Sequence, residues 1–380
     1  MTVFSFTAPE RTIFGRDSRK LAATEVARLG RRVFLVRGRS VPWVDALASM
    51  LVSGGTAVES FFSKGEPDID DVRDSVTRAR TFGADCVLAV GGGAAIDLGK
   101  AVSGLCPSEG DPSEYFALGS AEPRRLSCPL PFVAMPTTAG TGAEATRNAV
   151  IGIPDRQLKI SLRDQRLVPR LAIIDPALTD GLPKALTLAT GLDAITQLIE
   201  SYLCNRSNPV TDALCSGTIP LAIGALRDLM KQDTPDARDT MARASYLSGL
   251  ALANSGLGIV HGLASVIGAK GGAHGAICGR LLADSLKVNR EAAVSRGYPT
   301  IRFEEVDAWL AQGFDAGCDD GASDLKAFVD KQGLLTLHDL NLPETDFENT
   351  ARQALAASST KANPVGLDLQ EVTSILQNAS

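Results

Sequence analysis

The sequence predicts an α/β domain with a parallel sheet over residues 1–180 and an all-helical domain over residues 181–380. In the first half, short runs of β-branched and aromatic residues alternate with segments that have helical spacing of apolar residues, which is typical of a parallel sheet with helical crossovers. These strand signals stop at Asp175 and Pro176. Beyond the turn at 178–183, long amphipathic stretches follow with little strand signal. A chain of 380 residues is long enough for two such domains.

The first domain is predicted to contain four buried strands and the helices between them. The strands are 33–36, 86–90, 132–135 and 171–174. Helical spacing at 42–53 and 70–81 separates the first two strands, so the connection crosses over and the strands should be parallel.

The second domain is predicted to be a set of helices without internal repeats or low-complexity tracts. The apolar spacing places these helices at 188–203, 211–231, 237–255, 261–269, 303–316, 322–332, 344–357 and 369–377.

Composition limits the classes of partner. The chain has 38 basic and 44 acidic side chains, a net charge of −6, and neither sign forms long blocks, which disfavours nucleic acid and anionic membranes. No apolar run reaches about 18 residues, and the N-terminus lacks a leader pattern, so we expect neither membrane spanning nor secretion. The partners should be small molecules.

The cysteines favour a reducing, cytoplasmic location. They are odd in number, widely spread and without a CxxC pair, so we interpret them as reduced packing residues. They are Cys86, Cys106, Cys128, Cys204, Cys215, Cys278 and Cys318.

A triple glycine follows the second predicted strand and opens a predicted helix at 94–102. Gly91, Gly92, Gly93 and Ala94 would present unobstructed backbone amides at a helix N-terminus, a geometry that binds phosphate. Asp97 is placed in the first turn of this helix. It either stabilises the helix dipole or contacts the nicotinamide or ribose of a dinucleotide.

A second loop follows the third predicted strand and has the composition of a pyrophosphate site. Thr137, Thr138 and Thr141 offer hydroxyl donors beside Gly140 and Gly142. The two loops together predict a dinucleotide cofactor of the NAD(P)H type.

The end of the first predicted strand bears on which dinucleotide is used. A carboxylate at such a position usually binds the adenosine ribose, whereas basic residues accommodate a 2′-phosphate. Here Arg37, Gly38, Arg39 and Ser40 include no carboxylate. This favours NADP(H) or dual use, although the arginines could simply be solvated.

These features resemble the iron-containing, or group III, alcohol dehydrogenase superfamily over roughly residues 5–375. The resemblance implies a dehydroquinate synthase-like fold, with a reaction in the cleft between a dinucleotide domain and a helical metal domain, in a homodimer or larger homo-oligomer. Lys159 and Leu182 complete the expected cofactor-binding set. The motifs that carry the resemblance are Gly91–Lys100, Pro136–Glu144, Asp175–Pro176, Gly191–Ala194, His261–Gly262 and His274–Gly275.

The resemblance also implies a metal site in which one ligand is substituted. The family uses an Asp, a His four residues later and two further His, and the matching residues here are Asp193, Gln197, His261 and His274. A neutral amide is a poorer ligand for Fe²⁺ or Zn²⁺ than imidazole. Two outcomes stay open: a weakened metal site, or a metal-free site like that of the maleylacetate reductase branch.

The proton relay is altered too. Many relatives carry another His one turn after His261, where this chain has Ser265, and a hydroxyl cannot store a proton near neutral pH. The general acid or base is therefore His261, His274, a water or another residue such as Tyr202. His338 lies in a segment that looks remote.

We therefore expect reversible hydride transfer between a nicotinamide and a small alcohol, aldehyde or ketone. A metal-free maleylacetate reductase-like enzyme and a noncatalytic nucleotide-binding protein are the alternatives. A lyase resembling dehydroquinate synthase needs several Lys and Arg around the site, and the sequence offers mainly Lys270 there.

Overall fold

The chain forms two compact units in the computed structural model, which describes residues 3–38, 41, 43–118, 122–156 and 158–380. The first, called here the sheet unit, comprises Thr7–Thr138 and Ala143–Thr179. The second, the helical unit, contains Asp180–Ser380 together with Ala139–Gly142 and the N-terminal segment up to Phe6. A short stretch of the second glycine loop thus belongs with the helices.

The sheet unit is built on six parallel strands in the order β1-β8-β5-β4-β2-β3. The four predicted strands are confirmed as β2, β4, β5 and β8. The two edge strands were not predicted because β1 is short and half exposed, and β3 carries polar residues on its open side. The strands are β1 Arg11–Phe14, β2 Arg32–Arg37, β3 Ala57–Phe62, β4 Cys86–Gly91, β5 Phe132–Pro136 and β8 Leu171–Ile174.

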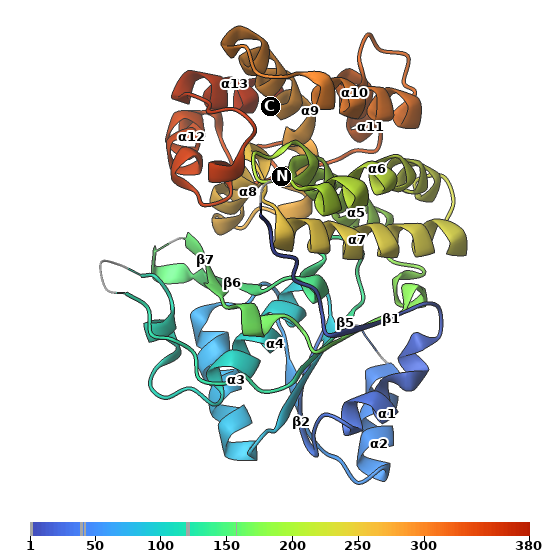
Figure 1. Cartoon of the computed structure of the whole chain (residues 1–380), viewed down its shortest axis with the longest axis vertical. Coiled ribbons are helices and arrows are strands. Elements are labelled where there is room, and N and C mark those ends of the chain that lie inside the picture. Colours follow the sequence, from blue (N-terminus) through green and yellow to red (C-terminus); the bar gives the residue numbers. More distant parts are fainter. Residues whose placement is uncertain (1–2, 39–40, 42, 119–121, 157) are drawn as a thin grey trace. The chain divides into compact units, whose positions relative to one another are not determined.

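Helices cover both faces of this sheet (Figure 1). Successive residues of a strand point to opposite faces, so Leu35 of β2 packs in the core with Leu47 of α2, while Phe34 packs in the core with Val72 of α3. Burial on both faces explains why these strands are continuous apolar runs. One face carries α1 Ala22–Ala27 and α2 Trp43–Ser53, and the other carries α3 Ile69–Phe82 and α4 Gly93–Leu105.

A separate antiparallel pair, β6 Asn148–Ile153 and β7 Leu158–Arg163, was not predicted. It packs against α4. Strand β6 alternates buried and half-buried residues and β7 is mostly half-buried, so neither is uniformly buried like the strands at the centre of the large sheet.

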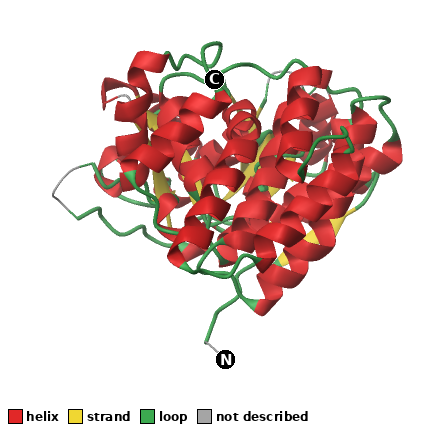
Figure 2. Ribbon diagram, turned by 90° about the horizontal axis from the view of Figure 1, so that it is seen from above, coloured by secondary structure: helices red, strands yellow, loops and turns green. Residues whose placement is uncertain are grey.

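The helical unit contains helices and no strand among its described residues. In Figure 2, helices (red) predominate over strands (yellow) in the chain as a whole. The eight predicted helices are confirmed, with ends that shift by up to four residues. The longest, α9, was not predicted because consecutive residues from Ala276 to Ser285 are all buried, which removes the one-sided apolar stripe. The helices are α5 Lys184–Leu203, α6 Pro209–Leu229, α7 Pro235–Asn254, α8 Ile259–Ala269, α9 His274–Arg296, α10 Ile301–Phe314, α11 Gly321–Lys331, α12 Phe347–Ala356 and α13 Leu369–Ala379.

Helix α6 is long and apolar enough in composition to cross a membrane, and so is the bent pair α7 and α8. Core helices of soluble proteins pass the same test. Ile219, Ile223 and Leu226 of α6 belong to the core of the helical unit, where α6 contacts α5, α7 and α10.

Candidate active site

Helix α5 supplies Asp193 and Gln197, one turn apart on the same face. Both side chains are buried, with relative exposures of 2% each. Within the part of the chain that the structure describes, Asp193 Oδ1 and Gln197 Oε1 have no hydrogen-bond partner. The amide of Gln197 donates to the carbonyl of Gly140 at 3.2 Å. Because that carbonyl can only accept, the amide nitrogen is committed and the amide oxygen is left free.

Helix α8 supplies His261, and Glu200 of α5 fixes its orientation. The Oε2 atom of Glu200 lies 2.6 Å from His261 Nδ1, and its Oε1 accepts from the backbone of Val260 at 2.8 Å. The helix begins after Gly258, where a Cβ would lie 2.7 Å from Glu200 Oε1, so only glycine lets the carboxylate approach. With Nδ1 donating to Glu200, Nε2 keeps a free lone pair for a cation.

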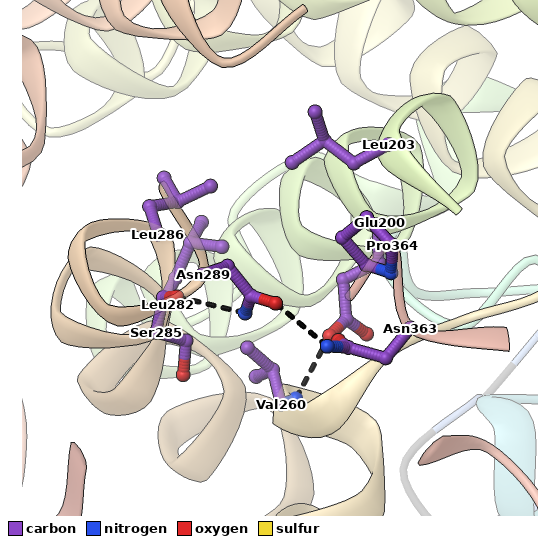
Figure 3. Close-up of a pocket in the computed structure, with 9 residues that line it drawn as sticks. All are labelled: Glu200, Leu203, Val260, Leu282, Ser285, Leu286, Asn289, Asn363 and Pro364. Atoms are coloured by element: carbon purple, nitrogen blue, oxygen red, sulfur yellow. Dashed lines mark hydrogen bonds between the residues drawn. The ribbon is translucent and has the colours of Figure 1, made fainter. Parts of the chain in front are cut away.

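Glu200 also lines part of a small cavity of about 20 Å³ (Figure 3). Asn363 lines it and accepts at Oδ1 from the amide of Ile259 at 3.0 Å. Its amide donates to Asn289 Oδ1 at 2.6 Å. Glu200 and Asn363 together therefore satisfy the first amides of α8 and hold the turn that carries His261.

Helix α9 supplies His274 at its first residue and Cys278 one turn later. His274 Nε2 lies 3.7 Å from Asp193 Oδ1, and His261 Nε2 lies 3.5 Å from the same oxygen. Cys278 Sγ lies 3.7 Å from His274 Nε2 and 3.9 Å from His261 Nε2. One ligand atom from each of these four residues falls within 4.8 Å of every other.

Two glycines of α9 allow this convergence. A Cβ on Gly275 would lie 2.4 Å from the carbonyl oxygen of Ala189, and one on Gly279 would lie 2.5 Å from Leu192 Cδ1. Both neighbours are on α5. His274 and Cys278 are thus each followed by a glycine that lets α9 approach α5, which places His274 beside Asp193.

The four groups perturb one another's pKa values. Burial raises the pKa of Asp193 and of Cys278, but the adjacent imidazoles outweigh it and both values fall below the ordinary ones. For His274, burial lowers the pKa, yet Cys278 and Asp193 raise it to about 9. His261 is raised well above its ordinary value against the same burial, by Cys278, Asp193 and Glu200.

The donor set fits a divalent transition metal. A carboxylate, two imidazoles and a thiol are ligands that Zn²⁺ and Fe²⁺ accept. The buried Asp193 Oδ1, which has no hydrogen-bond donor within the described ranges, is the kind of atom a cation would satisfy. The structure thus brings together three of the predicted ligands, Asp193, His261 and His274.

Sequence reasoning missed Cys278, which we had interpreted as a packing residue. One signal was available: Cys278 follows His274 by four residues, the same spacing as Asp193 and Gln197, and so shares its helix face. The helix itself was not predicted, so the spacing was not used.

Gly38, Gly91 and Thr137, three of the predicted cofactor-binding residues, lie at the carboxyl ends of neighbouring strands of the sheet. β4 lies between β2 and β5, and the chain continues from β2 to one side and from β4 to the other. Gly38 donates to Val90 at 3.0 Å, and Thr137 donates to Gly91 at 2.9 Å. Such a reversal of strand order is where parallel α/β sheets bind nucleotides.

The first glycine loop matches the prediction in most respects. Gly91 ends β4, Gly92 is the N-cap of α4, and Gly93 and Ala94 begin the helix. Asp97, however, lies past the first turn, which contains no acidic residue. Its carboxylate accepts a hydrogen bond from the backbone of Val150 on β6 at 3.1 Å. The proposed dipole role of Asp97 is therefore wrong, while a cofactor contact stays a prediction.

The second loop uses its glycines for packing. Gly142 has a φ of 57°, and a Cβ there would lie 2.4 Å from the carbonyl oxygen of Ser245 on α7. A Cβ on Gly140 would lie 2.9 Å from Thr190 Cβ on α5. Close contact with these helices accounts for both glycines, and their predicted part in leaving room for a pyrophosphate stays a prediction. Thr137, Thr138 and Thr141 stay predicted cofactor contacts.

The remaining residues considered for cofactor binding differ in their contacts. Arg37 is buried, pairs with Asp45 and donates to Val41 at 3.0 Å, so it is already engaged. Arg39 lies outside the described residues. Lys159 on β7 pairs with Glu66, and the carbonyl of Leu182 accepts from Arg238 at 3.3 Å. Lys159 and Leu182 stay predictions.

The candidate proton-transfer residues differ in whether they lie at the cluster. Ser265 donates to the carbonyl of Gly262 at 2.7 Å within α8. Tyr202 packs on α10, where it donates to Glu305 at 2.5 Å, and burial and this carboxylate raise its pKa to about 12. His338 is exposed in a turn. Of the residues considered, His261 and His274 stand at the cluster.

Known proteins resemble this chain in sequence and in fold. Residues 9–176 match the family "Iron-containing alcohol dehydrogenase", and residues 187–380 match its C-terminal family. The 1,3-propanediol dehydrogenase of Klebsiella pneumoniae is 31% identical over 99% of both chains. The NAD-dependent methanol dehydrogenase of Bacillus methanolicus is 29% identical over 99% of both.

Solved structures agree. A 1,3-propanediol oxidoreductase superposes with a TM-score of 0.86 at 29% identity over all of both chains, and an alcohol dehydrogenase from Oenococcus oeni does so at 26% identity with the same score. The chain belongs to the iron-containing alcohol dehydrogenase family. The predictions of the fold and of a nicotinamide-dependent alcohol oxidoreductase are confirmed at the level of this family.

Proposed function

We propose that this protein interconverts a small alcohol and its aldehyde or ketone with NAD(H), using a divalent metal held by Asp193, His261 and His274. The observation that carries the proposal is the convergence of two imidazole Nε2 atoms on the buried Asp193 Oδ1, at 3.5 and 3.7 Å. Relatives named as methanol and 1,3-propanediol dehydrogenases support a short alcohol as the substrate class.

The surroundings of each residue at the cluster indicate its role in the proposed reaction. When bound, the metal would act as a Lewis acid on the substrate oxygen while the nicotinamide exchanges hydride with the carbon. Glu200 holds His261 in one tautomer, which suits it to bind a cation rather than to shuttle a proton. The side chain of His274 is 33% exposed against 7% for His261, so substrate reaches the cluster past His274.

Coenzyme choice follows from the end of β2. To reach a 2′-phosphate, Arg37 would have to leave Asp45 and Val41. The basic character that favoured NADP(H) therefore rests on Arg39, and NAD(H) is the coenzyme we propose for most of the activity. A cytoplasmic location and a homodimer belong to the same proposal, and the seven free cysteines support the location.

The test is a coenzyme oxidation assay with purified protein. NADH and NADPH are each offered with short aldehydes, keto acids and maleylacetate, before and after chelation and reloading with Zn²⁺ or Fe²⁺. We expect aldehyde reduction with NADH that is lost on chelation and restored by metal. Turnover of maleylacetate alone, unaffected by chelation, would instead assign the metal-free branch. Binding of NADH without turnover of any substrate would refute the enzyme.

A further inference from the structure

We infer that Cys278 supplies a thiolate ligand to the metal, so that the site consists of Asp193, His261, His274 and Cys278 rather than being completed by residue 197. This donor set should select Zn²⁺ over Fe²⁺. The inference rests on the metal of the proposed function and departs from the ligand set that the family resemblance implied.

The first support is the geometry. A tetrahedral Zn²⁺ with bonds of about 2.0–2.3 Å separates its ligand atoms by about 3.3–3.6 Å. The four measured separations are 3.5 Å and 3.7 Å from Asp193 Oδ1 to the two imidazole nitrogens, and 3.7 Å and 3.9 Å from Cys278 Sγ to the same nitrogens. These four of the six separations lie within a few tenths of an ångström of that range, and all six are no longer than 4.8 Å.

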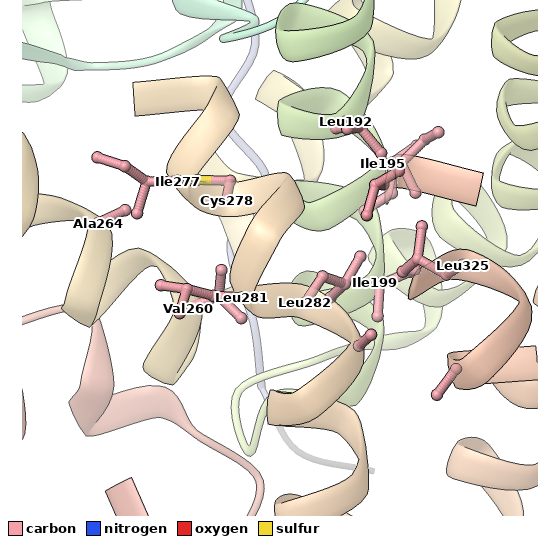
Figure 4. Close-up of a cluster of buried hydrophobic side chains, with 14 of the residues drawn as sticks. Leu192, Ile195, Ile199, Val260, Ala264, Ile277, Cys278, Leu281, Leu282 and Leu325 are labelled. Atoms are coloured by element: carbon pink, nitrogen blue, oxygen red, sulfur yellow. The ribbon is translucent and has the colours of Figure 1, made fainter. Parts of the chain in front are cut away.

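The second support is the contrast between Cys278 and other buried cysteines. Cys204 Sγ lies 3.3 Å from the backbone carbonyl of Ser201, and Cys86 Sγ lies 3.9 Å from that of Val87. Cys278 Sγ instead lies near two imidazole nitrogens. It does so although α9 packs it among apolar side chains of α5 and α8 (Figure 4).

The third support is the state of residue 197. The amide nitrogen of Gln197 is committed to Gly140, so only its neutral oxygen could bind a cation. The buried oxygens of Asp193 and Gln197 both lack hydrogen-bond donors among the described residues. Of the side chains near Asp193, Cys278 offers the stronger ligand, because a thiolate brings a full charge and a soft donor atom that Zn²⁺ binds well.

Charge favours a divalent cation at this site, and ligand softness favours Zn²⁺ over Fe²⁺. With Asp193 and Cys278 both ionised, two negative charges balance a divalent cation in a site whose members are almost fully buried, apart from His274. Replacing an imidazole by a thiolate also shifts preference towards metals that accept soft ligands.

The test uses the full-length protein loaded with Co²⁺, because a thiolate bound to Co²⁺ gives an intense charge-transfer band in the near ultraviolet. We expect this band in the native protein and in Gln197→His, and its loss in Cys278→Ser. Cys215, buried in the same core, provides the matched control, and Cys215→Ser should keep the band. The native spectrum decides the question even where Cys278→Ser fails to fold.

Affinity and selectivity are measured on the same proteins. Competition with a chelator should show Zn²⁺ binding weakened at least about tenfold by Cys278→Ser, since loss of a supporting residue alone costs that much. Offered equimolar Zn²⁺ and Fe²⁺ without oxygen, the native protein should take Zn²⁺, and the double variant Cys278→Ser with Gln197→His should shift towards Fe²⁺.

The outcomes separate this inference from the proposed function. One bound Co²⁺ without the thiolate band, and unchanged Zn²⁺ affinity in Cys278→Ser, would overturn the role of Cys278 while metal-dependent turnover could still be measured. Failure of the native protein to bind any of the three metals would overturn both.

Discussion

At the scale of single residues, the site depends on a carboxylate outside the four-residue cluster, that of Glu200. Glu200 supplies no ligand atom to the cluster. Its two oxygens instead hold His261 Nδ1 and the first turn of α8. A carboxylate in this position sets the tautomer of a metal-binding imidazole and raises its basicity.

Replacing Glu200 by Gln should weaken Zn²⁺ binding by about 10–100-fold, because the amide cannot accept with both of its terminal atoms. The measurement is chelator competition, with thermal unfolding of the metal-free protein as a check on folding. Glu305→Gln is the matched control, since Glu305 on α10 accepts a hydrogen bond from Tyr202 of α5. Equal affinity in the two variants would show that Glu200 only caps α8.

Residue identity was predictable where a spacing or a resemblance defined it, as for Asp193, His261 and His274. Cys278 was not, because a cysteine among Leu and Ile has the composition of a core. Its role emerges only from the contact between α9 and α5, which connects residues distant in the sequence.

At the scale of elements, the close approach of α5 and α9 positions the ligands. Gly275→Ala should therefore lower the free energy of unfolding by about 1–3 kcal/mol and weaken metal binding, since the added Cβ meets the backbone of Ala189 at 2.4 Å. Urea unfolding and chelator competition measure the two effects.

The matched control is Gly217→Ala in α6, where a Cβ would meet nothing within 4 Å. That change should stabilise the protein by up to about 1 kcal/mol, the ordinary gain of Ala over Gly in a helix. If both glycine variants were equally stable, the contact between α5 and α9 would not be the constraint that we infer.

Element prediction succeeded where one face of a helix, or both faces of a strand, had a uniform environment. It failed for α9, which is buried around most of its circumference, and for β6 and β7. The alternate burial of β6 is not matched by alternating apolar and polar residues, and β7 is mostly half-buried. The glycine loop at 139–142 was predicted as a loop, but its association with the helical unit depends on tertiary packing.

At the scale of the whole molecule, stability should depend on pH through two buried groups of the sheet unit. Lys100 of α4 is fully buried, and its ammonium donates to Thr146 Oγ1 at 2.7 Å and to the carbonyl of Asn148 at 3.0 Å. Glu144 is buried as well. Burial raises the pKa of Glu144 to about 7 and lowers that of Lys100 to about 8.

Glu144 determines how stability depends on pH on the acidic side. Between its ordinary pKa of 4.5 and the folded value of about 7, the folded state keeps a proton that the unfolded state has lost, so stability falls as pH rises through this window. Glu144→Gln stays neutral and should remove that dependence. Relative to the variant, the native protein should lose up to about 3 kcal/mol between pH 5 and 7.5 in urea unfolding. A constant difference between the two proteins would contradict the raised pKa.

Lys100 determines how stability depends on pH on the alkaline side, where stability rises with pH rather than falling. Below pH 8, Lys100 is protonated in both the folded and the unfolded state, and burial of its ammonium destabilises the folded state. Between about pH 8 and the ordinary pKa of 10.5, Lys100 loses its proton only in the folded state. Stability therefore rises with pH in this range. Lys100→Met should be less stable than the native protein, because the carbonyl of Asn148 loses its hydrogen-bond donor. The stability of this variant should no longer rise with pH in this range. The native protein should gain up to about 3 kcal/mol on the variant between pH 7.5 and 10. Parallel curves for the two proteins would mean that Lys100 stays charged inside the fold, with Glu144 and Asp97 compensating its burial.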